Sequence, residues 1–310
     1  MVCYHPLQAD FTVRSDGKKK LVFSNSKAKL FEQGLLPIVS NNSLSLPCGK
    51  CMGCRLERSR QWAIRIMHEA SLYADNCFVT LTYDEEHLSK MCPNGSLVRK
   101  HVQDFLKRLR RRFDNSRIRY YYCGEYGDAL RRPHYHLCLF NLDFGDKTLH
   151  TVRRGFEYFV SPTLQSLWPY GHSLISALTF DSAAYVARYC TKKITGDIAD
   201  DHYQGRLPEF GQASLKPGIG SGWLDRFGFT DVWNHDNVVV DGALCKPPRY
   251  YDKVLERLDP VAYERMRKQR LESALLIASD NNYDRLLVKE KCHKARVKDL
   301  RRPLEVSNGY

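Results

Sequence analysis

The chain has 310 residues, of which 43% are hydrophobic and 12% aromatic, enough for a packed core in one large domain or two modest ones. No uninterrupted apolar run is long enough to cross a membrane, and the amino-terminal MVCYHPLQAD lacks the pattern of a signal peptide. We therefore expect a globular, cytoplasmic protein with no membrane partner. The formal net charge of +13 favours a polyanion, nucleic acid above all, as the partner.

The cysteine pattern indicates a metal site. Eleven cysteines without a secretion signal argue against a disulfide framework and favour metal binding or plain burial. Cys48, Cys51 and Cys54 have C-x₂-C-x₂-C spacing, which predicts a structural zinc site, with Cys3 or His5 as the fourth ligand. An iron–sulfur cluster and unpaired buried thiols are the alternatives.

The first clear elements begin at residue 55. Apolar residues at helical spacing predict an amphipathic helix over residues 55–72, and alternation in CFVTLTY predicts a strand over 77–83. A second helix, over residues 98–113 with Ser96 as its cap, has one apolar face and one cationic face. The candidate DNA-binding residues on the cationic face are Arg108, Arg110, Arg111 and Arg112.

The middle of the chain alternates strands and helices. RIRYYYC (117–123) and HYHLCLF (134–140) are strand-like runs joined by a turn-rich segment, so they predict a hairpin. A short helix over 163–168 and a strand over 173–180 follow. SAAYVARYCTKKI (182–194) predicts a helix with Asp181 or Ser182 as its N-cap.

This order of elements predicts an α+β fold in which helices flank an antiparallel sheet. Beyond about residue 195 the pattern weakens: residues 205–223 resemble a loop, NVVVDGALCKPPRYY could form a hairpin, and residues 254–300 look helical and basic. The expected divisions are an amino-terminal metal-binding segment, a core, and a loop-rich and then basic helical region. Their boundaries are 1–54, 55–200 and 201–310.

Two histidines in the expected hairpin form a candidate metal site. His134 and His136 are two residues apart in a strand and therefore share a face. Glu125, at the end of the preceding strand, is the natural third ligand. This set suits Mg²⁺ or Mn²⁺ engaging a phosphate, although zinc or iron would also accept it.

The helix expected at 182–194 supplies candidate nucleophiles. Tyr185 and Tyr189 are four residues apart, so both hydroxyls lie on one face, and Lys192 extends that face. The alternative is that both tyrosines are amphipathic core residues.

Several motifs, in the same order, carry a family resemblance. RPHYH resembles the histidine-hydrophobe-histidine motif of the HUH endonucleases, FVTLTY their upstream strand motif, and YVARYCTKK the YxxxYxxK of their two-tyrosine branch. With PCGKCMGCRLERSRQWAIR, CGEYGDALRRPHYH and KPPRYYDK, the chain resembles the replication initiator proteins of the Microviridae, gokushovirus type, as far as about residue 255.

The resemblance implies an HUH fold, a ferredoxin-like or RRM-like palm, and rolling-circle initiation on single-stranded and replicative-form viral DNA. One tyrosine would attack a phosphate held by the metal, giving a 5′-phosphotyrosine and a 3′-hydroxyl that primes a host polymerase beside a host helicase. The second tyrosine would cut or rejoin later. Lys192 would neutralise phosphate charge, and Lys193 would contact the DNA backbone.

Two other readings stay open. A relaxase or single-strand transposase has the same core of metal, histidine pair and tyrosine. A non-catalytic module could instead bind single-stranded nucleic acid by stacking bases on RYYYC as an aromatic platform.

Overall fold

The computed structural model groups its described residues into two compact units. The described residues are 3–13, 19–23, 44–113, 117–128, 130–153, 155–187, 193–194, 196, 198–240 and 242–299. The core unit is formed by Arg58–Ser273. The terminal unit joins Met1–Glu57 to Ala274–Leu300.

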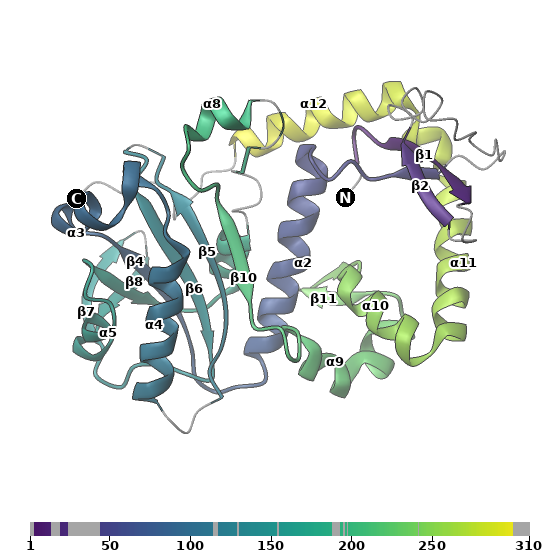
Figure 1. The fold of residues 1–310 in the computed structure, drawn as a ribbon. Helices are drawn as coiled ribbons and strands as arrows, with labels where there is room; N and C mark the ends of the chain where they lie inside the picture. The colour runs from purple at the N-terminus through teal and green to yellow at the C-terminus, as the bar shows by residue number, and fades with distance from the viewer. Residues whose placement is uncertain are drawn as a thin grey trace. The chain divides into compact units, whose positions relative to one another are not determined.

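The core unit is built on a wholly antiparallel sheet, seven-stranded among the described residues (Figure 1). From edge to edge its strands are β10 (Phe210–Ala213), β5 (Arg119–Tyr126), β6 (Pro133–Phe140), β4 (Asn76–Thr82), β9 (Ser173–Ser176), β8 (Phe156–Val160) and β7 (Thr148–Arg153). The expected hairpin is β5 and β6, and the strand expected at 77–83 is β4, which pairs with β6. The predicted α+β class with an antiparallel sheet is therefore confirmed.

One face of the sheet packs against α4 (Arg99–Arg112) and α5 (Pro162–Leu167). The buried side of α4 repeats at helical spacing, with Val102, Phe105 and Leu109 completely covered. These side chains meet alternate residues of β4 and β6 in the largest apolar cluster. The fully buried ring of Trp168, just after α5, joins the same cluster.

The opposite face is only partly covered, by α2 (Met52–Ala70) and α6 (Phe180–Ala187). Ala63, Ile66 and Val186 are among the helix residues that pack onto Phe140 and its neighbours. Small side chains at this contact let the helices approach the sheet closely. Because this face carries the histidines of β6, the partial cover decides where the candidate site opens.

Shorter elements complete the core unit. They are α3 (Glu85–Met91), η2 (Pro93–Gly95), α8 (Ala199–Tyr203), α9 (Ser221–Phe227), η3 (Gly228–Trp233), the hairpin β11 (Val238–Val240) and β12 (Ala243–Cys245), α10 (Arg249–Leu258) and α11 (Pro260–Leu276), which runs into the terminal unit. The predicted hairpin near residue 240 and the helical character of 254–300 are confirmed. None of the helices within the described ranges has the length and apolar character needed to cross a membrane.

The terminal unit contains a three-stranded antiparallel sheet and a long helix. The sheet has the order β2 (Lys19–Phe23), β1 (Leu7–Val13), β3 (Leu44–Leu46), and the helical parts are η4 (Ala278–Asn281), α12 (Tyr283–Asp299) and the first turn of α2. Its buried apolar side chains among the described residues are few: Tyr4, Ala9, Val22 and Leu286. This is a small core for a unit of this size.

Both predicted helix caps are wrong. The hydroxyl of Ser96 donates to the Leu97 carbonyl and accepts from Leu207 N–H, and α4 starts two residues later without a side-chain cap. The helix expected to begin at Asp181 or Ser182 begins at Phe180. There Thr179 and Ser182 exchange side-chain to backbone bonds in the manner of a capping box.

Some elements escaped the sequence patterns. The strand expected over 173–180 ends at Ser176, because the chain turns into α6. The strands β7, β8 and β10 and the helix α3 were not predicted, nor were the three strands of the terminal unit. β7 and β10 are edge strands, where one side has no partner strand and the hydrophobic pattern is weak.

Candidate active site and metal centres

Strand register brings Glu125, His134 and His136 together. The two histidines share a face of β6, and the β5–β6 hairpin places Glu125 directly opposite His134. On the other side of β6, Thr80 of β4 lies opposite His136. The three candidate ligands are buried, with Glu125 only 2% exposed. Their placement follows from the pairing of three neighbouring strands and not from a flexible loop.

The ligand atoms converge on one carboxylate oxygen. Oε1 of Glu125 lies 3.1 Å from Nε2 of His134 and 3.2 Å from Nε2 of His136. Adjacent ligands on an octahedral ion with bonds of about 2.1 Å are about 3.0 Å apart, so the set fits a divalent cation. All three ligand atoms lie within 4.8 Å of one another.

The carboxylate is held in its charged form. Burial by itself raises the pKa of Glu125, but hydrogen bonds and positive charge from His134 and His136 outweigh it and hold this pKa well below its usual range. A charged carboxylate beside two imidazoles is the donor set that a divalent cation requires.

A second layer of contacts orients the imidazoles. Nδ1 of His134 lies 3.2 Å from the carbonyl oxygen of Arg132, which can only accept, so Nδ1 carries the proton and the lone pair is at Nε2. Nδ1 of His136 lies 3.0 Å from the hydroxyl of Thr80. Thr80 was not among the predicted site residues, although the alternation in FVTLTY places it on the histidine face.

Tyr185 reaches the same centre from α6. Its hydroxyl donates to Oε1 of Glu125 over 2.9 Å, and its ring meets the ring of His136 edge-on with centroids 5.0 Å apart. The side chain is 9% exposed. The structure therefore brings one of the two predicted tyrosines to the predicted metal ligands.

The other predicted residues of that helix are not all within the described ranges. Tyr189 and Lys192 lie outside the described residues. Lys193 is described as partly exposed, outside helices and strands.

A groove of about 370 Å³ opens on the uncovered part of this sheet face. Phe78 and Thr80 of β4 and Leu174 of β9 line it, together with residues 151–159 of the β7–β8 hairpin. His136 and Tyr185 line it too, so the groove reaches the candidate metal centre. Sequence patterns missed it because the β7–β8 hairpin was not predicted.

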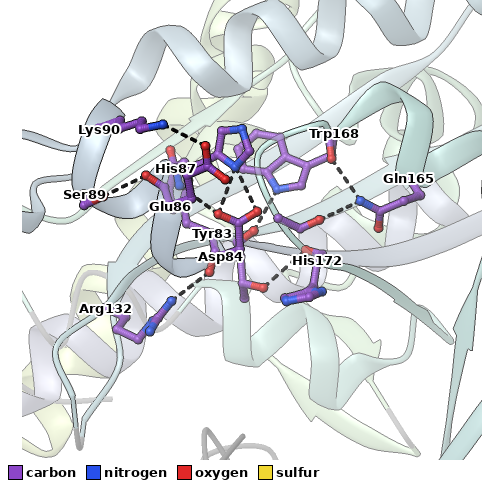
Figure 2. Close-up of polar contacts among 12 residues, drawn as sticks. Tyr83, Asp84, Glu86, His87, Ser89, Lys90, Arg132, Gln165, Trp168 and His172 are labelled. Carbon is purple, nitrogen blue, oxygen red and sulfur yellow. Dashed lines mark hydrogen bonds and ion pairs between the residues drawn. The ribbon is translucent and has the colours of Figure 1, made fainter.

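A hydrogen-bonded network fixes the end of the groove beyond β4 (Figure 2). The indole of Trp168 donates to the carbonyl of Thr82, and Thr82 N–H donates to the carbonyl of His172, which lines the groove. Between them, Gly171 has φ +153°, and a Cβ there would lie 2.4 Å from the backbone nitrogen of Asp84. Only glycine allows the two segments to approach this closely.

The predicted DNA-binding arginines are not equivalent. Arg108 is partly buried, and its Nε donates to the carbonyl of Leu167 over 2.9 Å. The other three, Arg110, Arg111 and Arg112, are exposed at the end of α4.

A second cavity, of about 510 Å³, lies beside the end of α4. Arg110 lines it together with Arg117 and Lys216. The guanidinium of Arg110 also lies 5.4 Å above the ring of Tyr120. The cavity is therefore cationic on several sides and suits a phosphate backbone.

The cysteine motif of the terminal unit also converges. The Sγ atoms of Cys3, Cys48, Cys51 and Cys54 all lie within 4.8 Å of one another. His5, the alternative fourth ligand, instead places Nε2 2.9 Å from a carboxylate oxygen of Glu290. The structure thus groups Cys3, and not His5, with the other three thiols.

The thiol of Cys51 shows how the backbone prepares this cluster. Burial raises its pKa, but backbone N–H groups of Cys54 and Tyr4 and side-chain contacts to Cys54 and Cys48 outweigh burial and lower the pKa to about 7. Donation of N–H groups to sulfur favours the thiolate, the form that binds metal.

Comparisons with known proteins agree with these features. A family model described as a replication-associated protein of the ORF2 type matches residues 76–194, which include the triad and Tyr185. Replication-associated protein ORF2 of Spiroplasma virus 4 is 32% identical over 98% of this chain and 99% of its own length. Replication-associated protein VP4 of Bdellovibrio phage phiMH2K is 31% identical over 92% of this chain and 87% of its own.

A third relative, Replication-associated protein ORF4 of Chlamydia phage 1, is 30% identical over 79% of this chain and 63% of its own length. No solved structure matches the chain. Similarity to the first relative extends over nearly the whole of both chains. The chain therefore belongs to the replication initiator proteins of the Microviridae, the family that its motifs resemble.

Proposed function

We propose that this replication initiator nicks and rejoins single-stranded DNA at the origin, with a tyrosine as nucleophile and a divalent cation at Glu125, His134 and His136. The observation that carries the proposal is the 2.9 Å hydrogen bond from the Tyr185 hydroxyl to Oε1 of Glu125. The same oxygen faces both imidazoles. A phenol held at a candidate metal centre is the arrangement that tyrosine-mediated strand transfer requires.

The chemistry divides between the cation and the side chains. Mg²⁺ or Mn²⁺ bound by the triad would polarise the scissile phosphate. The phenolic oxygen of Tyr185 forms a bond to phosphorus, the bond from phosphorus to the 3′ oxygen breaks, and the phenolic proton is balanced by one gained at the leaving oxygen. The products are a 5′-phosphotyrosine and a 3′-hydroxyl that a host polymerase, working with a host helicase, would extend.

Tyr189 and Lys192 take the remaining roles. A second phenol four residues from Tyr185 would carry out the later cutting or rejoining step, using the first phosphotyrosine as its substrate. Lys192 would neutralise charge on the phosphate or the leaving oxygen. Lys193 would contact the DNA backbone.

The groove supports a single-stranded substrate. It is continuous with His136 and Tyr185, so nucleotides beside the scissile phosphate would lie along it. Phe156 and Tyr158 of β8 offer aromatic surface, and Arg153 offers positive charge. Stacking and backbone neutralisation are the usual means of holding single strands.

The alternative of a purely binding module loses its proposed platform. Tyr121 and Tyr122 of RYYYC are 1% and 0% exposed, because helices cover both faces of β5. A relaxase or transposase would use the same chemistry, but the relatives found are phage replication-associated proteins.

Covalent adduct formation tests the proposal. We would incubate the protein with Mn²⁺ and single-stranded DNA covering the viral origin, separate it on a denaturing gel, and map the attached peptide by mass spectrometry. The expected result is a cation-dependent adduct at Tyr185 or Tyr189. An adduct that forms equally well in the presence of excess chelator, or that maps to another tyrosine, would overturn the proposal.

A further inference from the structure

The terminal unit contains a cluster of four thiols whose geometry is that of a metal site. The Sγ atoms of Cys51 and Cys3 are 3.9 Å apart. Tetrahedral zinc with bonds of about 2.3 Å to sulfur separates its sulfurs by about 3.8 Å. A disulfide needs about 2.05 Å, so the observed spacing suits a shared ion and not a covalent bond.

Backbone N–H groups point at the sulfurs. Cys48 N–H donates to Sγ of Cys3 over 3.2 Å, Cys51 N–H to Sγ of Cys48 over 3.3 Å, and Tyr4 N–H to Sγ of Cys51 over 3.5 Å. These bonds hold the thiols in place through the main chain. They also compensate the negative charge that thiolate ligands would carry.

The residues that follow Cys3 contact the carboxyl-terminal helix α12. The hydroxyl of Tyr4 lies 2.6 Å from Nδ1 of His293, and their rings meet edge-on with centroids 5.9 Å apart. His5 pairs with Glu290, which is only 8% exposed and also lies 3.2 Å from Lys294. The segment that supplies one thiol therefore also holds α12.

We propose that Zn²⁺ bound by Cys3, Cys48, Cys51 and Cys54 fastens the amino-terminal segment and, through Tyr4 and His5, secures helix α12. A metal is needed because the terminal unit has few buried apolar side chains of its own among the residues described. Structural zinc contributes folding free energy directly, so the ion replaces the missing core. This inference is independent of the proposed nicking reaction.

Metal content and hydrogen exchange of the full-length protein test the inference together. Elemental analysis is expected to find one zinc per chain. Removal of zinc by chelation should accelerate amide exchange in α12 roughly tenfold or more, while exchange in α4 of the core unit stays unchanged.

Matched variants separate the ligands from their neighbours. Cys3→Ser should lose the zinc and reproduce the fast exchange of α12. Cys292→Ser, on α12 itself and exposed, should retain both the zinc and slow exchange. His5→Gln should retain the zinc but loosen α12, because it removes the contact to Glu290 without removing a ligand.

Four results would overturn the inference. These are a wild-type protein without zinc, iron with visible absorption in its place, zinc retained by Cys3→Ser, and α12 exchange unaffected by zinc removal. If Cys3→Ser fails to fold, chelation of the wild-type protein still decides the point.

Discussion

Thr80 and the carbonyl of Arg132 show how single residues prepare the candidate site. Each contacts the Nδ1 atom of one imidazole, so Nε2 of both rings is turned toward Glu125. The strand pairing that places Thr80 opposite His136 is also the pairing that builds the sheet. Fold stability and ligand orientation therefore depend on the same hydrogen-bonded ladder.

The tyrosine pair gives the sharpest prediction at this scale. Tyr185→Phe or Tyr189→Phe alone should leave some cleavage of a short single-stranded substrate, and the double replacement should leave none. Phenylalanine keeps nearly all of the apolar area, so a packing role would leave all three variants active. Covalent adduct formation measures the difference.

A matched control is available on β5. The hydroxyl of Tyr122 is buried on the opposite face of the sheet and donates to Gln212, so Tyr122→Phe removes a comparable hydrogen bond away from the site. It should retain full adduct formation. Adduct that persists in the Tyr185 and Tyr189 double variant would rule out this nucleophile assignment.

At the scale of elements, the long central strands and helices were predictable and the edge strands were not. The hairpin at residues 119–140 follows from alternation and a turn-rich connection, and with it the approach of Glu125 to His134. The β7–β8 hairpin is short and partly exposed, so its pattern is weak, and the groove was missed with it. The choice of Cys3 over His5 depends on Glu290, 285 residues away, which no local pattern can show.

Helix α4 should contribute to DNA affinity through its exposed end. The double reversal Arg110→Glu with Arg111→Glu should flatten the salt dependence of binding to non-specific single-stranded DNA. If each arginine neutralises one phosphate, the slope of log K against log salt should change by about 1.4, since each contact accounts for about 0.7. Fluorescence anisotropy over a salt series measures this slope.

Reversal of Arg265 and Lys268, both exposed on α11, is the control because it changes the net charge equally. A slope that changes as much in this control would mean that net charge, and not α4, sets the affinity. An unchanged slope in the α4 variant would place the DNA contact elsewhere.

Helix α2 carries a pH-sensitive packing contact. Burial lowers the pKa of His68 from 6.5 to about 4, and its ring stacks on Trp223 with centroids 3.6 Å apart while Nδ1 lies 2.8 Å from the Tyr251 hydroxyl. Below pH 6.5 the unfolded chain binds a proton that the folded protein excludes. Stability should therefore fall between about pH 6.5 and pH 4, by about 3 kcal/mol at most.

Urea unfolding followed by tryptophan fluorescence over this pH range measures the effect. His68→Gln should flatten the pH dependence, whereas His150→Gln, at an exposed position on β7, should not. Equal pH dependence in wild type and His68→Gln would show that another group is responsible.

At the scale of the whole molecule, affinity and chemistry are carried by different parts of the surface. The net charge of +13 is spread along the chain, including the exposed end of α4, whereas the triad is buried at one end of a groove. Diffuse positive charge gives binding that is largely independent of sequence. The two properties should therefore respond separately to mutation.

His134→Ala tests that separation. It removes one candidate ligand from a buried site, so several kcal/mol of charge stabilisation at the phosphate should be lost and nicking should fall by at least about a thousandfold. DNA binding should change by less than about threefold, because no surface cation is altered. His101→Ala is the matched control, since His101 is a buried histidine that bonds to the hydroxyl of Tyr83 inside the other apolar cluster. It should cost stability but leave nicking intact. Nicking that survives in both His134→Ala and His136→Ala would refute the metal assignment, and a parallel loss of DNA binding in folded His134→Ala would place the histidines in binding instead of chemistry.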